Sequence, residues 1–116
     1  MIDALNILAC VLTIGFGAFG FLAPRYTASA LDLEPGETTM GLSELRASVG
    51  GLFVVTGAVA IWLADPMAYV MLGVCYVGAA LGRFLSLALD KPPFAKALIF
   101  GTIEAVLAAW LILANT

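Results

Sequence analysis

Apolar side chains dominate four stretches of the chain, and each stretch is long enough to cross a bilayer. A helix needs about 20 predominantly apolar residues to span the hydrocarbon core, because it rises only about 1.5 Å per residue. The predicted spans cover residues 4–22, 43–64, 67–89 and 94–114, and the second is uncharged from Ala47 onward. Pro24, Pro66 and the pair Pro92-Pro93 stand at the boundaries, where proline ends one helix or begins the next. The pattern predicts an all-α protein, a transmembrane four-helix bundle.

The connections between the spans differ in length. Asp65-Pro66 and the segment 90–93 are short, so we expect neighbouring spans to run antiparallel and side by side. The first connection is longer and covers residues 23–41. Its Glu34-Pro35-Gly36-Glu37 segment predicts a turn, and Tyr26 to Leu33 predicts a short helix at the membrane surface. The length of 116 residues predicts one integral membrane domain over residues 1–116.

Composition supports a chain surrounded by lipid. Hydrophobic residues make up 63% of the sequence and charged residues 11%, whereas a soluble domain carries about 25% charged residues. The net charge is −3 and no basic patch is present, which argues against a nucleic acid partner. The partner that the composition predicts is the lipid bilayer.

The residue types argue against covalent catalysis and against a metal site. The sequence contains no histidine, so its serines and cysteines have no ordinary general base, and no cluster has metal-ligand spacing. We therefore predict no catalytic residue, cofactor or metal, and no enzymatic activity. Cys10 and Cys75 lie inside apolar stretches, where we expect buried small hydrophobes rather than a disulfide.

Glycines punctuate the spans at short intervals. Gly15, Gly17 and Gly20 match the dinucleotide fingerprint, but they lie inside an apolar span with no strand before it. Small residues let membrane helices approach closely, so we interpret these glycines as packing positions. Gly78 and Gly82 form a GxxxG motif in the third span, which packs either within the chain or between copies.

The few basic residues predict an orientation. Cytoplasmic loops carry an excess of Lys and Arg, and here Arg25, Lys91 and Lys96 lie in or beside the first and third connections. The termini and the second connection carry none. We therefore expect both termini outside the cell. Asp3 and the absence of basic residues before the first span argue for a retained span rather than a cleaved signal.

Charged residues at membrane depth are the candidates for function. Arg83 lies six residues before the end of the third span, about 9 Å deep, and Glu104 lies ten residues into the fourth, about 15 Å deep. A long arginine can bridge that difference between adjacent helices. Glu44 and Arg46 begin the second span, and Tyr76 shares a helical stripe with Arg83. We predict a buried polar cluster of these five residues, either an ion-pair lock or a polar pocket or proton path.

Several short motifs resemble the domain-of-unknown-function 4345 family over nearly the whole chain. They are Phe21-Leu22-Ala23-Pro24, Ser43-Glu44-Leu45-Arg46-Ala47 with Gly50-Gly51, Gly82-Arg83 with Ser86-Leu87 and Asp90, and Glu104. The resemblance implies a small bacterial membrane protein with four spans, located in the cytoplasmic (inner) membrane, and it implies no particular reaction. The chain departs from the family at Lys91, where the resemblance leads us to expect a small residue such as glycine.

Two functions are consistent with these features. The first is an accessory or structural subunit that packs in a membrane complex or in a homo-oligomer through its glycine-lined helices. The second is a small carrier or proton-linked binding protein that uses the Glu/Arg cluster. A membrane enzyme ranks behind both, because no residue set supports catalysis.

Overall fold

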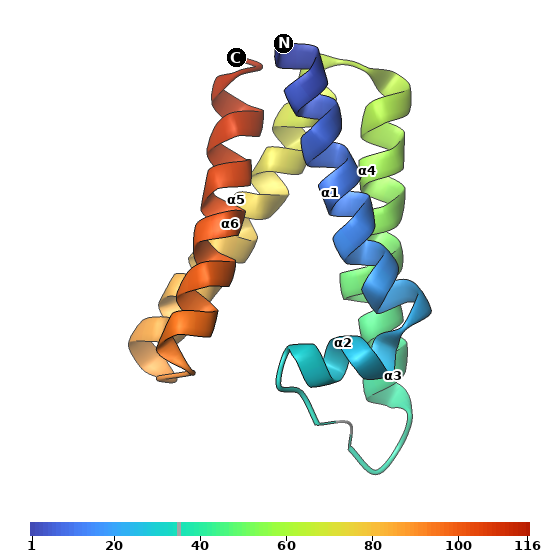
Figure 1. The fold of residues 1–116 in the computed structure, drawn as a ribbon, viewed down its shortest axis with the longest axis vertical. Coiled ribbons are helices and arrows are strands. Elements are labelled where there is room, and N and C mark those ends of the chain that lie inside the picture. The colour runs from blue at the N-terminus through green and yellow to red at the C-terminus, as the bar shows by residue number, and fades with distance from the viewer. Residues whose placement is uncertain (35) are drawn as a thin grey trace. The chain divides into compact units, whose positions relative to one another are not determined.

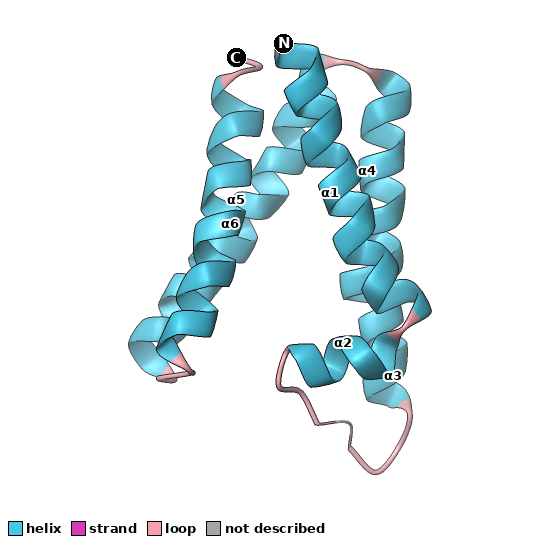
Figure 2. Cartoon of the chain, viewed as in Figure 1, coloured by secondary structure: helices cyan, strands magenta, loops and turns pink. Residues whose placement is uncertain are grey.

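The protein is built from helices. A computed structural model describes residues 1–34 and 36–116, and within these ranges it contains helices and no strand (Figure 2). Four helical segments are long and apolar enough to cross a membrane: Ile2–Leu22, Met40–Leu63, Pro66–Leu89 and Phe94–Leu113. They confirm the all-α fold and the four predicted spans, although the first two begin two and three residues earlier than expected. The chain is therefore a membrane protein.

The helices fall into two compact units, which are described separately. Unit 1 comprises Met1 and Asp3–Leu63, and unit 2 comprises Ile2 and Ala64–Thr116. Unit 1 contains α1 (Ile2–Leu22), α2 (Pro24–Ala30), α3 (Met40–Glu44), the π-helix η1 (Leu45–Gly51) and α4 (Leu52–Leu63). Unit 2 contains α5 (Pro66–Leu89) and α6 (Phe94–Leu113). The segments α3, η1 and α4 follow one another directly and together form the second span.

In unit 1, glycines bring α1 against the second span (Figure 1). A Cβ added to Gly17 would lie 2.8 Å from the Cβ of Phe53, and one added to Gly20 would lie 2.8 Å from the carbonyl oxygen of Val49. A Cβ added to Gly57 would lie 2.8 Å from the Ile14 side chain. These partners occur in opposite chain order, so α1 and the second span are antiparallel. The predicted packing role of these glycines is confirmed, whereas Gly15 has no atom near its Cβ position.

The π-helix η1 was not predicted, and it lies where the second span meets the end of α1. A Cβ added to Gly50 would come within 2.5 Å of the Phe21 backbone nitrogen. Only glycine allows such close backbone contact, because no side-chain rearrangement relieves a clash with backbone atoms. π-Turns are rare and are frequently found at functional sites. Here η1 places Gly50 and Arg46 together beside the α1 terminus.

The first connection begins with the predicted short helix. Pro24 occupies the first turn of α2, where its fixed φ suits a helix and its missing N–H is not needed. The helix covers Pro24–Ala30 rather than residues 26–33, and Asp32 then adopts a left-handed backbone with φ 58°. The predicted turn at 34–37 includes Pro35, which lies outside the described residues.

Unit 2 is an antiparallel pair of long helices (Figure 1). The Asp65 carboxylate caps α5 by accepting a hydrogen bond from the Met67 backbone N–H at 2.7 Å. Near one end of the pair, a Cβ added to Gly73 would lie 3.0 Å from the Cβ of Leu111. Toward the other end, a Cβ added to Gly101 would lie 3.0 Å from Cγ of Arg83. The predicted antiparallel packing of the third and fourth spans is confirmed.

The GxxxG motif of α5 lies away from this contact. No atom is within 4 Å of the position that a Cβ would take on Gly78 or Gly82. Cys75 is exposed on the same helix, although we expected it to be buried, and Cys10 is buried in α1; both are free thiols. Gly73 and Gly101, rather than the GxxxG glycines, therefore let α5 and α6 approach each other.

Candidate functional site

An ion pair joins the two helices of unit 2. Nε of Arg83 donates a hydrogen bond to Oε1 of Glu104 at a distance of 3.0 Å. The Arg83 side chain keeps 36% of its surface exposed, and the Glu104 side chain keeps 14%. From the sequence, the helical rise predicts a difference in depth of about 6 Å between the two Cα atoms, which an arginine side chain can cover. The contact that we expected between Arg83 and a carboxylate of the cluster is present.

Neighbouring residues on α6 shape the path of the arginine. Gly101 has no side chain, which leaves room for the Arg83 stem and for the Phe84 ring. The Cζ atom of Arg83 lies 5.4 Å from the centre of the Phe100 ring, within the range of a cation–π interaction. Phe100 and Glu104 are four residues apart and therefore share a helix face. One face of α6 thus contacts Arg83 through the Phe100 ring and the Glu104 carboxylate, and Gly101 on that face leaves room for the arginine stem.

The hydrogen-bonding capacity of the pair is only partly used. A guanidinium carries five N–H donors, and an arginine–carboxylate pair is commonly bidentate. Within unit 2, only the Nε–H of Arg83 meets an acceptor, and Oε2 of Glu104 accepts no hydrogen bond. Four guanidinium N–H donors and one carboxylate oxygen are left for another group. In hydrocarbon such groups need partners, because no water is present to satisfy them.

Arg46 forms a different contact in unit 1. Its Nη1 donates a hydrogen bond to the backbone carbonyl oxygen of Phe21 at 2.7 Å. The last four carbonyl groups of a helix lack intrahelical donors, and α1 ends at Leu22 before Pro24. A cation at this end also interacts favourably with the helix dipole. Arg46 therefore caps α1 and ties it to η1.

The predicted five-residue cluster draws its members from both units. Arg83 and Glu104 belong to unit 2, as does Tyr76, which is buried two helical turns before Arg83 on α5. Glu44 and Arg46 belong to unit 1, and both are exposed there. The convergence of all five residues stays a prediction.

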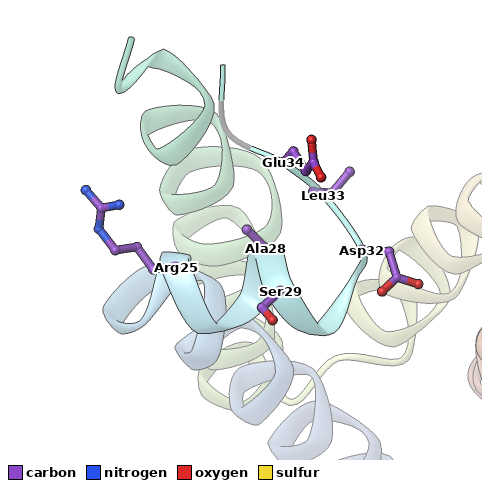
Figure 3. A pocket seen from close by; sticks show the side chains of 6 residues that line it. All are labelled: Arg25, Ala28, Ser29, Asp32, Leu33 and Glu34. Atoms are coloured by element: carbon purple, nitrogen blue, oxygen red, sulfur yellow. The ribbon is translucent and has the colours of Figure 1, made fainter. Parts of the chain in front are cut away.

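Two open depressions lie in unit 1. One, of about 490 Å³, is lined by Arg25, Ala28, Ser29, Asp32, Leu33 and Glu34, and its charged side chains spread apart rather than toward one point (Figure 3). The other, of about 530 Å³, is lined by Thr39, Leu42, Ser43, Arg46 and Ala47. Neither brings charged groups together as the pair in unit 2 does. Within residues 1–34 and 36–116, no three His, Cys, Asp or Glu side chains gather as metal ligands would.

Comparison with known protein families identifies the family of this chain. A family described as Domain of unknown function (DUF4345) matches residues 2–115. The chain belongs to the DUF4345 family. No curated protein and no solved structure matches it. The match covers all four spans of this DUF4345 protein and both helices that carry the Arg83–Glu104 pair.

Sequence reasoning missed some residues of the site in this DUF4345 member. Gly101 and Phe100 surround the arginine, yet neither carries a charge that would have drawn attention. One signal was available: Gly101 lies three residues before Glu104, so it shares that residue's helix face. The carbonyl group that Arg46 caps had no such signal, because a free backbone acceptor appears only once the helix end is known.

Proposed function

We propose that this protein is a non-catalytic subunit of the bacterial cytoplasmic membrane that associates with a membrane complex or with its own copies. One observation carries the proposal: the GxxxG motif of α5 is unused by the neighbouring helix. An added Cβ on Gly78 or Gly82 would meet no atom within 4 Å, whereas Gly73 and Gly101 are in close contact with the opposite helix.

An open GxxxG face on α5 is suited to helix association in a bilayer. Lipid tails are as apolar as leucine, so helices in a bilayer associate through close packing rather than through the hydrophobic effect. A GxxxG face permits that close packing with an incoming helix. The outer face of α5 also presents Met71 and Leu81, both largely exposed. The proposed association uses this face.

The proposed subunit has no evident catalytic site. The sequence has no histidine to act as a base for a serine or cysteine nucleophile. The cytoplasmic membrane of a bacterium is proposed from the family resemblance together with the four apolar helices.

Leucine substitutions in α5 test the association. We expect Gly78→Leu or Gly82→Leu to dissociate the native assembly, because a bulky group prevents close helix contact. The α5–α6 pair should stay folded, since neither substitution meets an atom of α6. Crosslinking in native membranes and size analysis in mild detergent measure the assembly.

Two control variants make the result specific. Gly15→Leu places the same bulk at another open glycine outside the motif, and Leu72→Ala removes a buried side chain of α5. Both should leave the assembly in place. If all four variants assemble like the parent protein, the α5 face is not an association surface.

A second candidate function is a small carrier that binds an amphipathic ligand at Arg83 and Glu104. The observation that favours it is the half-used ion pair, which leaves four N–H donors and one acceptor without partners in unit 2. Purification in mild detergent separates the candidates: a stoichiometric protein partner or a homo-oligomer supports a subunit, and a bound small molecule supports a carrier.

A further inference from the structure

We infer that the Arg83–Glu104 pair binds the carboxyl group of a neutral, lipid-soluble, single-chain carboxylic acid. The carbonyl oxygen of the acid accepts a hydrogen bond from an Nη–H of Arg83, and its O–H donates to Oε2 of Glu104. This inference rests on the second candidate function, a carrier, and names its ligand class.

The unused hydrogen-bonding groups define what the ligand must offer. The pair presents N–H donors on the Nη atoms of Arg83 beside an acceptor, Oε2 of Glu104. A molecule that satisfies both needs one acceptor and one donor a short distance apart. A protonated carboxyl group has this arrangement on a single carbon. A methyl ester of the same acid keeps the acceptor and lacks the donor.

Charge distinguishes a carboxylic acid from a phosphate. Arg83 and Glu104 together carry no net charge, so an added phosphate would leave at least one uncompensated negative charge at membrane depth. Burying an unpaired charge costs far more than burying a hydrogen-bonded neutral group. A neutral acid adds no charge and can reach the pair through hydrocarbon.

The surroundings of the pair suit an apolar chain. The Phe100 ring lies beside the guanidinium, and the Phe84 ring borders Gly101. Phe84 is 40% exposed and Ile103 is also 40% exposed, so apolar surface continues outward from the pair. The Arg83 side chain itself keeps 36% of its surface exposed. An alkyl chain can therefore lie on these side chains while its carboxyl group reaches the pair.

Photo-crosslinking of the full chain tests the assignment. The protein is placed in phosphatidylcholine nanodiscs with palmitic acid that carries a diazirine in its alkyl chain. Parallel samples receive the methyl ester of the same probe or a phosphatidic acid with a diazirine in one chain. Mass spectrometry then measures labelling of peptides from α5 and α6. We expect saturable labelling by the acid, which unlabelled palmitic acid displaces and its methyl ester does not.

Matched variants locate the binding group. Arg83→Gln should lower labelling by the acid about tenfold, the effect of losing one hydrogen bond to a charged group. Arg83→Lys should keep part of the labelling, because it retains donors and the charge. Arg25→Gln removes an exposed arginine of α2 that is not part of the predicted cluster, and it should leave labelling unchanged. Displacement of the labelled acid by unlabelled palmitic acid is measured in the unaltered protein. The test therefore does not depend on whether a variant folds.

Each contrary result has a distinct meaning. Equal labelling by acid and ester overturns the assignment, as does equal loss in Arg83→Gln and Arg25→Gln. If only the phosphatidic acid probe labels in an Arg83-dependent way, the carboxylic acid assignment is wrong and the carrier function stands. If no probe labels in an Arg83-dependent way and no small molecule co-purifies, both are wrong.

Discussion

Arg83 shows how a single charged residue is accommodated at membrane depth. An arginine near the centre of a span costs about 2.5–3.5 kcal/mol on insertion scales. The contact with Oε1 of Glu104 and the position over the Phe100 ring offset part of that cost. Gly101 makes the arrangement sterically allowed. The two charged residues therefore depend on each other, and losing either one leaves the other exposed to hydrocarbon.

The first prediction is a destabilised Arg83→Ala variant. Removing one partner of a buried ion pair costs about 3–5 kcal/mol, and the partial exposure of Arg83 places the expected loss near the lower end. Glu104→Ala in the same chain should recover part of the loss, because no carboxylate is then stranded. Unfolding by SDS in bicelles measures both variants. Arg25→Ala, an exposed residue of α2, should change stability little. Additive losses in the double variant would contradict the coupling.

The second prediction concerns Lys91, the first residue after the α5 C-cap. Lys91 has φ 50°, in the left-handed region that favours glycine, which gives a physical reason for the small residue expected there from the family. We expect Lys91→Gly to raise the free energy of unfolding by about 1 kcal/mol. Asp90→Gly is the control: Asp90 has φ −105°, so glycine only adds unfolded-chain entropy and should lower stability. A loss of stability in Lys91→Gly would contradict the strain argument.

At the residue scale, the estimated depths of Arg83 and Glu104 predicted their ion pair. Contacts that depend on local backbone geometry could not be predicted from the sequence. The contact of Arg83 with Glu104 follows from the helical rise and from the adjacency that a short loop imposes. The acceptor of Arg46 does not follow, because the free Phe21 carbonyl arises from the end of α1 before Pro24. A single glycine in the sequence also does not indicate whether it contacts a neighbouring helix. Gly101 and Gly78 look alike in sequence, yet only Gly101 touches the opposite helix.

At the element scale, apolar length decided which segments are helices. The four spans were predictable, because about 20 predominantly apolar residues have few alternatives to a membrane helix. The π-helix η1 was not, since the Leu45–Gly51 residues carry no pattern that separates a π-turn from an α-turn. The second span also begins at Met40, three residues before our estimate, because α3 extends into a polar segment. Apolar runs report the membrane-embedded part of a helix and not its ends.

The third prediction tests the contact between α1 and η1. We expect Gly50→Ala to destabilise the protein by about 1–3 kcal/mol, since its Cβ would lie 2.5 Å from the Phe21 backbone nitrogen. Gly15→Ala adds the same methyl group in open space, and alanine favours a helix by up to about 1 kcal/mol over glycine. It should be neutral or stabilising. The same SDS titration in bicelles compares the two. Equal stability of both variants would mean that α1 and η1 are not in close contact at Gly50.

At the scale of the whole molecule, the outward surface is that of a lipid-embedded protein. Large apolar side chains are exposed along every span; Leu22 is 71% exposed and Trp62 is 80% exposed. Soluble monomers rarely expose apolar patches of this extent. The predicted single domain and the predicted meeting of Glu44 and Arg46 with Arg83 and Glu104 involve both units. Both stay predictions, because the contacts described above lie within one unit or the other.

The last prediction is the orientation in the membrane. Arg25, Lys91 and Lys96 lie in or beside the first and third connections, and basic residues are retained on the cytoplasmic side. Four spans place both termini on one side, which should then be the outside. Alkaline phosphatase fused at Asn115 or near Pro66 should be active, and a fluorescent protein should be bright only when fused near Gly36 or Pro92. Replacing the three basic residues by glutamine should weaken this preference and give mixed signals at each site. The reverse reporter pattern in the unaltered chain would invert the orientation, and it would place Arg83 nearer the outer surface than the inner one.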